Sequence, residues 1–319
     1  MARVSVGIVL FFPNEERLIK NIDTIKNSTE YIYIYNNGSE SELVEKLKII
    51  EKVVMLGTGI NKGIAFALNQ ILKRAKADAQ EWVVTYDQDS LSTCDLIKEF
   101  ERMIPEYKDA AILCPRVVDD RRRYVKQNIT DSIELVDRCI TSASCTNIDA
   151  WSRIGGFDDK LFIDLVDNDF CKRIRISGME IVKNNAILLN QEFGNISIID
   201  NSLSRILLKL SDVVYKLGFS YLSYNIGKLT YKKKVSPLRV YYTNRNVLYL
   251  NKKFNNYGGI GYECYRCNSY LGFQITFNLA SVVRGRDKIK IIKAIFNGIR
   301  DGYSLAKSTD PLAVIEAHK

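Results

Sequence analysis

Apolar blocks and helical periods alternate along the first third of the chain. Residues 4–12 form an unbroken apolar run ended by Pro13, which is typical of a strand buried on both faces of a parallel sheet. Residues 13–27 then carry apolar side chains at helical spacing. Further strands are predicted at 31–35, 52–56 and 81–86, with helices at 41–50 and 63–77. This order predicts an α/β fold, a Rossmann-like doubly wound sheet.

Polar clusters follow each of the four predicted strands. They are residues 13–15, 36–39, 59–63 and 87–89. Turns are often polar for conformational reasons alone, and that alternative covers any single cluster. Ligands of doubly wound sheets bind beyond the carboxyl ends of the strands, and the last cluster carries two aspartates. The set therefore predicts one binding crevice.

The pattern changes after about residue 204. Residues 206–217 keep a helical period, and a second apolar stretch runs from Cys267 to Val283. It contains Asn268, Gln274, Asn278 and Ser281, so it is a poor membrane span. Its polar and apolar residues fall on opposite sides of a helix, which predicts an amphipathic helix packed on the main domain or lying at a lipid surface. We expect two regions, a catalytic domain at 1–204 and a mainly helical extension at 205–319.

Charge is divided unevenly between these regions. Residues 200–319 hold 20 Lys and Arg against 7 Asp and Glu, whereas residues 1–199 hold 26 against 30. A basic region is suited to nucleic acid or to anionic lipid. The aromatic residues of the tail fall at core-like spacing without a helix-turn-helix or RNA-binding signature, which argues against nucleic acid. Membrane contact and homodimerisation both remain open as its role.

Cysteine and histidine usage narrows the chemistry. The seven cysteines are scattered and the only histidine is His318, so Ser/His/Asp and Cys/His nucleophiles are excluded. A reduced, cytoplasmic setting fits best. The single CxxC, Cys264 to Cys267, lacks the further ligands that zinc requires, so we expect ordinary thiols there rather than a metal or redox pair. The N-terminal apolar run lacks a cleavage site and is expected to be a core strand rather than a secretion signal.

Two aspartates, Asp87 and Asp89, end the fourth predicted strand with one glutamine between them. Residues i and i+2 of a strand point to the same side, so the two carboxylates would repel unless a cation lay between them. A divalent ion of the Mg²⁺ or Mn²⁺ type takes such ligands and completes its shell with phosphate oxygens. A surface turn or a helix N-cap explains the pair about as well.

A second acidic cluster comprises Asp164, Asp167 and Asp169, just before a helix that carries Lys172, Arg173 and Arg175. The helix dipole and ion pairs account for some of these acids. Three aspartates exceed what a helix cap requires. One of them is therefore a candidate general base for a hydroxyl group.

Taken together, these stretches resemble the bacterial inverting glycosyltransferases of the GT-A fold (family two), and within them the rhamnosyltransferase group of surface-polysaccharide synthesis. The matching stretches are VGIVLFFPNEERL, YNNGS, NKGIAFALNQ, DQDS, TSASCTNIDAWSRIGGFDDKLFIDLVDNDFCKRIR, YYTNRNVLYL and KIKIIKAIFNGIRDG. They are spread over nearly the whole chain, and the last two are typical of the rhamnosyl group.

The resemblance implies a role for individual residues. Pro13, Asn14 and Glu15 would border the nucleotide, and Asn36 would meet the pyrimidine edge. The nucleotide and phosphate side would be lined by Asn61, Lys62, Gly63, Ala65 and Asn69. Asp87 would approach the ribose or the metal, and Asp89 would bind the metal. Asp167 would be the base, supported by Asp169 and Arg173.

The resemblance also implies a reaction. A sugar, L-rhamnose from dTDP-L-rhamnose, would pass with inversion to a hydroxyl of a lipid-linked glycan at the inner face of the plasma membrane, with Mg²⁺ or Mn²⁺ as cofactor. The alternatives are another donor, UDP-hexose or galactofuranose, and a catalytically inactive glycan-binding relative.

Two positions depart from the family pattern. Many relatives have Asp where this chain has Asn36, whose amide lacks the charge, so nucleotide affinity or base preference would change. Relatives also often carry a metal-binding His where this chain has Gln191, in the segment 191–194. Glu192 or water would have to replace that ligand.

Overall fold

The first half of the chain alternates strands and helices, as predicted. The computed structural model describes residues 2–88, 90–92, 96–119, 121–122, 125, 132–190, 196–260, 262, 265 and 267–310. The first elements are β1 (Val4–Leu10), α1 (Glu15–Ile25), the 3₁₀ turn Lys26–Ser28, β2 (Ile32–Asn36), α2 (Ser41–Lys48), β3 (Val53–Leu56), α3 (Ile64–Ala77) and β4 (Trp82–Asp87). The four strands predicted from the apolar runs are confirmed.

The strands form one mixed sheet. The elements that follow β4 are β5 (Leu91–Ser92), α4 (Leu96–Met103), β6 (Ala110–Val118), β7 (Ile133–Leu135), β8 (Ser144–Asn147), α5 (Ile148–Arg153), α6 (Val166–Ile176) and β9 (Glu180–Asn190). In the described part of the chain the strand order is β3-β2-β1-β4-β8-β6-β9-β5, with β7 paired to β9. β1 to β4 are parallel, and β8 runs antiparallel between β4 and β6.

This topology places the carboxyl ends of several strands at one edge of the sheet. β6 is antiparallel to β8, as β4 is, so β4 and β6 point the same way. Their carboxyl ends therefore lie at the same edge as those of β1 and β2. β9 is parallel to β6 and follows α6, so the start of α6 returns to that edge.

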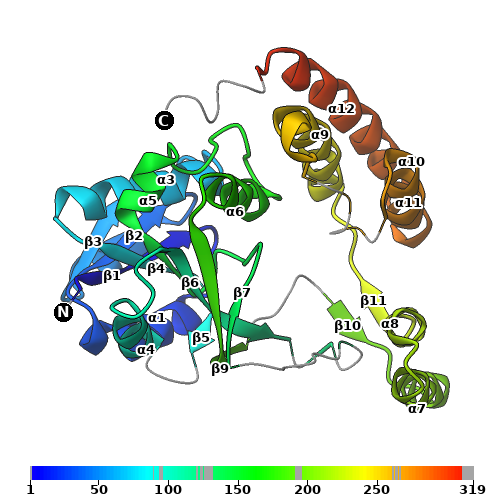
Figure 1. Cartoon of the computed structure of the whole chain (residues 1–319), viewed down its shortest axis with the longest axis horizontal. Helices are drawn as coiled ribbons and strands as arrows, with labels where there is room; N and C mark the ends of the chain where they lie inside the picture. Colours follow the sequence, from blue (N-terminus) through cyan, green and yellow to red (C-terminus); the bar gives the residue numbers. More distant parts are fainter. Residues whose placement is uncertain are drawn as a thin grey trace.

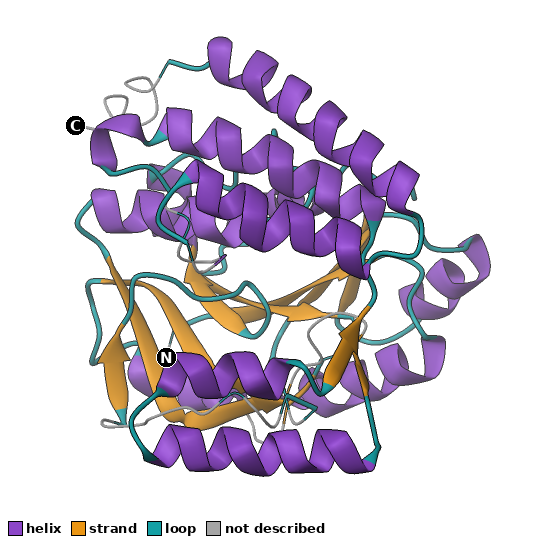
Figure 2. Ribbon diagram, turned by 90° about the vertical axis from the view of Figure 1, so that its right-hand side faces the viewer, coloured by secondary structure: helices purple, strands orange, loops and turns teal. Residues whose placement is uncertain are grey.

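Helices cover both faces of the sheet (Figure 2). On one face, residues of α1, α2 and α4 form a buried core with β1 and β4. On the other face, α3, α5 and α6 pack on the sheet so closely that a Cβ at Gly7 would lie 2.6 Å from Ile71 Cγ2. This second core also contains Val247, Leu250 and Phe254, so the C-terminal segment that carries them shares the interior of the sheet region.

The C-terminal region is mainly helical. Its elements are β10 (Ile196–Ile198), α7 (Ser202–Lys216), α8 (Ser220–Lys228), β11 (Tyr231–Lys233), α9 (Pro237–Lys253), the 3₁₀ turn Asn255–Tyr257, α10 (Tyr270–Phe273), the π-helical segment Gln274–Leu279, α11 (Ala280–Arg284) and α12 (Lys288–Lys307). Figure 1 shows α9 beside α6, with α10, α11 and α12 beyond it, and α7 and α8 with the short β10–β11 sheet set apart. α12 packs tightly on α9, because a Cβ at Gly298 would lie 2.4 Å from the Tyr241 carbonyl oxygen.

The predicted amphipathic segment is helical, and its polar side is the packed one. Asn278 is buried and exchanges hydrogen bonds of 2.8 Å with Asn244 of α9. Leu271, Ile275 and Leu279 on the other side are 71%, 54% and 56% exposed. The helix thus turns this row of aliphatic side chains outward, whereas Phe273, which is fully buried, and Phe277 pack inward together with Asn278. No helix in the described part of the chain is long and apolar enough to cross a membrane.

Candidate active site

Asp87 lies at the carboxyl end of β4, where its carboxylate is half-buried. Its backbone is fixed from two sides: its N–H donates to Ser142 Oγ (3.4 Å), and its carbonyl accepts from Asn21 Nδ2 (3.4 Å). Gln88 points to β1 instead, with its amide paired to the N–H and carbonyl of Phe11 at 2.8 and 3.0 Å. The glutamine between the two acids therefore ties the β4 loop to the β1 loop. Asp89 lies outside the described residues.

The carboxylate of Asp87 suits a divalent cation bound partly by substrate. No cluster of three His, Cys, Asp or Glu side chains able to hold a metal occurs among the described residues. Mg²⁺ commonly takes one or two carboxylates and receives its other ligands from substrate phosphates and water. A carboxylate at this edge of the sheet fits such a partly protein-bound ion. The described part of the chain contains no complete set of protein ligands for it. The segment 191–194, including Gln191 and Glu192, lies outside the described residues.

Asparagine side chains shape the loops after β2 and β3. Asn36 Oδ1 accepts from the N–H groups of Gly38 (3.1 Å) and Ser39 (2.8 Å). Asn61 Oδ1 accepts from Gly63 N–H (3.0 Å). The oxygen of Asn36 is therefore occupied within its own turn, a task that Asp performs equally well. Contact of Asn36 with a pyrimidine stays a prediction, and it would fall to the Nδ2 group.

The start of α3 is pressed against the loop that precedes α6. Gly63 has φ +89°, and a Cβ there would lie 2.7 Å from the Phe162 carbonyl oxygen. That same oxygen accepts a hydrogen bond from Ile64 N–H at 2.8 Å. Only glycine combines this backbone conformation with this approach. The nucleotide side and the aspartate cluster are thus joined here.

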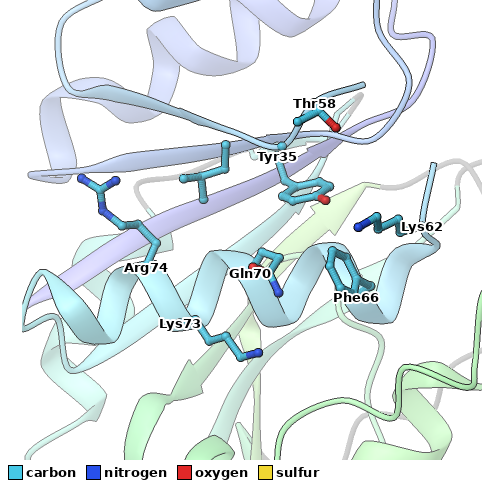
Figure 3. Close-up of a pocket in the computed structure, with 9 residues that line it drawn as sticks. Tyr35, Thr58, Lys62, Phe66, Gln70, Lys73 and Arg74 are labelled. Carbon is cyan, nitrogen blue, oxygen red and sulfur yellow. The ribbon is translucent and has the colours of Figure 1, made fainter. Parts of the chain in front are cut away.

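A pocket of about 420 Å³ opens between β2, β3 and α3 (Figure 3). Lys62 lies at its mouth, with Nζ 4.8 Å from the centre of the Phe66 ring. Tyr35 forms the opposite wall, and Lys73 and Arg74 continue the lining along α3. The combination of aromatic rings and cations suits a ligand with a planar group and negative charge. Lys62, predicted to face the phosphates, is on its rim.

Other residues expected at the nucleotide have local partners. Asn14 caps α1 by accepting from Arg17 N–H (2.9 Å), and Glu15 forms an exposed ion pair with Lys46 (3.1 Å). Pro13 lies half-buried just before that cap. These contacts account for the polar residues 13–15 after β1 without the need for a bound ligand. A role of these residues at the nucleotide stays a prediction.

Asn69 and Ala65 belong to the interior of α3. Asn69 Nδ2 donates to the Phe157 carbonyl and to Asp159, and its Oδ1 accepts from Trp151 Nε1 and Phe157 N–H, all within 2.7 to 3.0 Å. Ala65 is fully buried. Because every polar capacity of Asn69 is used inside the protein, the structure assigns it to positioning the loop before α6. This differs from the nucleotide contact expected from the family pattern.

Asp167 stands in the first turn of α6, at the same edge of the sheet as Asp87. Its carboxyl group is half-buried, and desolvation raises its pKa to about 6, although Asn168 N–H donates to it at 3.0 Å. Asp164 also raises this pKa, and Arg239 of α9 lowers it. The preceding Asp164 and Leu165 have φ of 65° and 64°. Two consecutive left-handed non-glycine residues are costly, and such strain often marks a functional turn.

Asp169 is held in a buried network of charges. Arg173 donates to Asp169 Oδ2 from Nε and Nη2 (2.9 and 2.6 Å), and Lys253 Nζ donates to Oδ1 at 2.6 Å. Lys253 also donates to Asp158 Oδ2 (2.6 Å), which Tyr249 approaches equally closely. Asp169 is fully buried and both of its oxygens are occupied. Asp169 and Arg173 therefore position α6, and Asp167 is the candidate base.

Helix α9 supplies residues that the motif search did not assign. Arg239 is paired with Asp164, and Asn246 donates to the carbonyls of Ile163 (2.9 Å) and Asp164 (2.8 Å). These two residues hold the strained turn before Asp167, and Lys253 of the same helix binds Asp158 and Asp169. The stretch YYTNRNVLYL did resemble the family, but nothing in its spacing indicates which loop it contacts.

The cysteines of the described part are free thiols, namely Cys114, Cys139, Cys145, Cys171 and Cys267. Cys264, the other half of the CxxC pair, lies outside the described residues. The free thiols of the described part give no support for a redox or metal role of the pair Cys264 and Cys267.

An α/β sheet with polar loops at the carboxyl ends of its strands, a carboxylate after β4 and a second carboxylate at the start of α6 is typical of nucleotide-binding α/β enzymes. The chain belongs to glycosyl transferase family 2, whose sequence model matches residues 5–174, more than half of its 319 residues. It is 28% identical over 181 residues to the dTDP-rhamnosyl transferase RfbF of Shigella flexneri. That match covers 52% of this chain and 61% of the relative, less than two thirds of its length.

The similarity extends to solved structures. The crystal structure of GalNAc-T7 with UDP, GalNAc and Mn²⁺ superposes with a TM-score of 0.51 at 12% identity, over 60% of this chain and 44% of that one. Residues 1–349 of S. aureus TarS give a TM-score of 0.46 at 13% identity, over 96% of this chain and 90% of that one. The GT-A fold with a helical C-terminal extension, predicted from the sequence, is confirmed.

Proposed function

We propose that this protein transfers a sugar from a nucleotide-sugar donor to an acceptor hydroxyl, with inversion, and that Asp167 is the general base. The observation that carries this proposal is a half-buried carboxylate whose pKa is raised to about 6, at the edge of the sheet that also holds Asp87. A base with a pKa just below neutral is mostly ionised at pH 7 and still accepts a proton readily. The neighbouring acids are occupied in ion pairs.

The reaction is a single displacement. The acceptor hydroxyl gives its proton to Asp167 as its oxygen bonds to the anomeric carbon, while the bond from that carbon to the phosphate oxygen breaks. The nucleoside diphosphate leaves with the bonding electrons. Lys62 and the α3 N-terminus, whose N–H groups favour anions, support the departing charge. Asp169, Arg173 and Lys253 keep Asp167 in place.

We further propose that Mg²⁺ or Mn²⁺ assists, held by Asp87 and Asp89. When bound, such an ion supplies neutralisation of the diphosphate charge. For the donor, we favour dTDP-L-rhamnose, because the curated relative is named a dTDP-rhamnosyl transferase. UDP-hexose and galactofuranose donors remain the alternatives.

A donor screen tests the proposed function. Purified protein is mixed separately with dTDP-rhamnose and with UDP-sugars, with and without Mn²⁺, and thermal shift and nucleotide release are followed. We expect the largest shift and the release of dTDP with dTDP-rhamnose. Absence of a shift with every nucleotide sugar would contradict the proposal. Binding without release, even when glycan acceptors are added, would favour an inactive glycan-binding relative.

We propose a lipid-linked glycan as acceptor and the inner face of the plasma membrane as the place of action. Support comes from the outward apolar side of the segment 271–283 and from exposed Ile289 and Phe296 on α12. Basic residues follow this segment in the sequence and continue into α12: Arg284, Arg286, Lys288, Lys290 and Lys293. Apolar side chains flanked by cations suit an anionic lipid surface.

Vesicle binding tests this contact. The wild type should sediment with vesicles containing phosphatidylglycerol and much less with pure phosphatidylcholine. The triple variant Leu271→Ser, Ile275→Ser, Leu279→Ser should lose most of that binding and stay folded, since these side chains are exposed. Equal sedimentation of the variant, or a concentration-dependent dimer that the variant abolishes, would assign the surface to a second copy of the chain instead.

A further inference from the structure

A second pocket, of about 410 Å³, lies on the far side of β4 from the nucleotide loops. Its walls come from the end of β6, the middle of β9 and the 138–144 loop that leads into β8. Three cationic side chains line it: Arg116, Arg138 and Lys183. None of the motifs matched to the family falls on these three residues.

The 138–144 loop connects this pocket to both candidate reacting groups. Ser142 accepts from the Asp87 N–H, and Ser90 Oγ lies 2.9 Å from Ser142 Oγ. Cys139, in the pocket wall, has its Sγ 3.8 Å from Sγ of Cys171, which lies one helical turn beyond Asp167. The pocket therefore adjoins the space between the two carboxylates.

The pocket is displaced from the donor loops along the sheet. β8 separates β4 from β6, and adjacent strands lie about 4.8 Å apart, so the end of β6 is about 10 Å from Asp87. The pocket at Lys62 lies on the opposite side of β4, beyond β1. A donor bound across the nucleotide loops would leave the transferred sugar near Asp87 and the β6 pocket open to the other substrate.

The charges of the pocket are only partly balanced. Lys183 is paired with Glu134 at 2.7 Å. Arg116 has a buried Nε with no hydrogen-bond acceptor among the described residues. A guanidinium N–H without an acceptor is costly. Because Arg116 lines the pocket, an anion bound there would pair with its guanidinium group. Arginine forks match the paired oxygens of phosphate and of carboxylate.

We propose that this pocket binds an anionic group, phosphate or carboxylate, that the acceptor carries beside the hydroxyl to be glycosylated. The inference rests on the proposed function and names the class of acceptor: a glycan with a phosphoryl linkage or an acidic sugar. Arg116 forms the main contact, and Arg138 and Lys183 contribute charge. Recognition of this group would orient the acceptor hydroxyl toward Asp167.

The experiment measures binding of three small probes to the protein saturated with dTDP and Mg²⁺. The probes are N-acetylglucosamine 1-phosphate, methyl glucuronide and neutral methyl N-acetylglucosaminide, followed by calorimetry. At least one anionic probe should bind about tenfold or more tightly than the neutral one, and weaken as salt rises. The anion that binds better distinguishes a phosphoryl linkage from an acidic sugar.

Variants locate the site. Arg116→Gln and, separately, the exposed Arg138→Gln should each remove most of the preference for the anion while dTDP affinity stays within twofold of wild type. Arg153→Gln, an exposed cation at the end of α5, is the matched control and should change nothing. If Arg116→Gln fails to fold, Arg138→Gln still tests whether the pocket binds the anion.

Two results would overturn the inference. Equal affinity for neutral and anionic probes would do so, as would anion binding that neither variant alters. Failure of the proposed function has a different signature: the wild type would bind no dTDP, UDP or nucleotide sugar, whatever the probes do. The two failures are thus told apart by the nucleotide titration that precedes the probes.

Discussion

The nucleotide side and the base side of the site are built in different ways. In the loops after β2 and β3 the side-chain hydrogen bonds described above are local: Asn36 accepts from Gly38 and Ser39, and Asn61 accepts from Gly63. Longer-range bonds, such as that from Phe11 N–H to Gln88, connect these loops to their neighbours. On the base side the hydrogen-bond partners are distant in sequence. Lys253 lies 84 positions from Asp169, and Arg239 lies 75 positions from Asp164.

The contrast indicates which half depends on the C-terminal region. The nucleotide loops are held by their own turns and by β1 to β4, so we expect them to keep their shape when α9 is perturbed. The turn before Asp167 is strained and is held by Arg239 and Asn246 of α9, and Lys253 of the same helix binds Asp169 in the first turn of α6. Changes in α9 should therefore impair transfer more than nucleotide binding.

Removing the base should give the largest difference between the two halves of the site, because it should impair transfer and leave donor binding intact. In Asp167→Asn the proton acceptor is lost and the shape is kept, so transfer should fall by about 10³-fold, within the range for general bases. Donor affinity, measured by calorimetry with dTDP-rhamnose, should stay within about threefold because the nucleotide loops are untouched.

Asp149→Asn is the matched control for Asp167→Asn, since Asp149 is also in the first turn of a helix but is exposed. It should leave transfer unchanged. Near-normal turnover in Asp167→Asn would show that another group accepts the proton, and the assignment of Asp167 would have to be withdrawn.

Removing a cation of α9 from the buried charge network tests directly whether transfer depends on this helix. Lys253→Met keeps the length of the side chain but removes the cation that neutralises Asp158 and Asp169, and Lys253 is only 3% exposed. Loss of one partner of a buried ion pair costs about 3–5 kcal/mol. We expect a loss of that size in the free energy of unfolding, measured by urea titration, and a lower kcat.

Lys252→Met provides the comparison for Lys253→Met, because Lys252 is adjacent and exposed. It should change stability by less than about 0.5 kcal/mol, as surface substitutions usually do. If Lys253→Met were as stable as Lys252→Met, or lost nucleotide affinity as much as turnover, the contrast between the two halves would be wrong.

The sequence predicted the strands of the nucleotide half well because their signals are local, whereas the roles of its residues at a nucleotide stay predictions. Unbroken apolar runs identified β1, β2, β3 and β4, and the polar residues after them lie at one edge, as parallel strands require. The Asp87 position followed from the same logic. Even here the role of Gln88 was invisible, since its contact with Phe11 depends on which strand neighbours β4.

The base half could be predicted only in part. The aspartate cluster was evident from composition, but the choice between Asp167 and Asp169 depends on burial, and Asp169 is occupied by Lys253. A hydrogen-bond partner that lies 84 positions away in the sequence produces no periodic pattern from which the pair could be predicted. The helix after residue 267 shows the same limit: its two sides were predicted, but which one packs on α9 depends on Asn244, which receives Asn278.

The smallest expected effect concerns the pH dependence of the base. Burial raises the pKa of Asp167 to about 6, and Arg239 opposes that rise. Activity should therefore fall as pH drops through about 6, because the base becomes protonated. In Arg239→Gln the opposing cation is gone, so the acidic limb of the kcat/KM profile should move to higher pH, and the plateau rate should also fall because the turn before Asp167 loses its contact with Arg239.

Arg205→Gln, which removes an exposed cation on α7 far from α6, should leave the profile of wild type intact. Arg239→Gln also frees Asp164, whose charge raises the pKa of Asp167, so both consequences move the limb in the same direction. A limb that did not move would mean that the charge of Arg239 does not act on the base. A uniform loss of rate at all pH values would mean instead that Arg239 acts only by holding the turn.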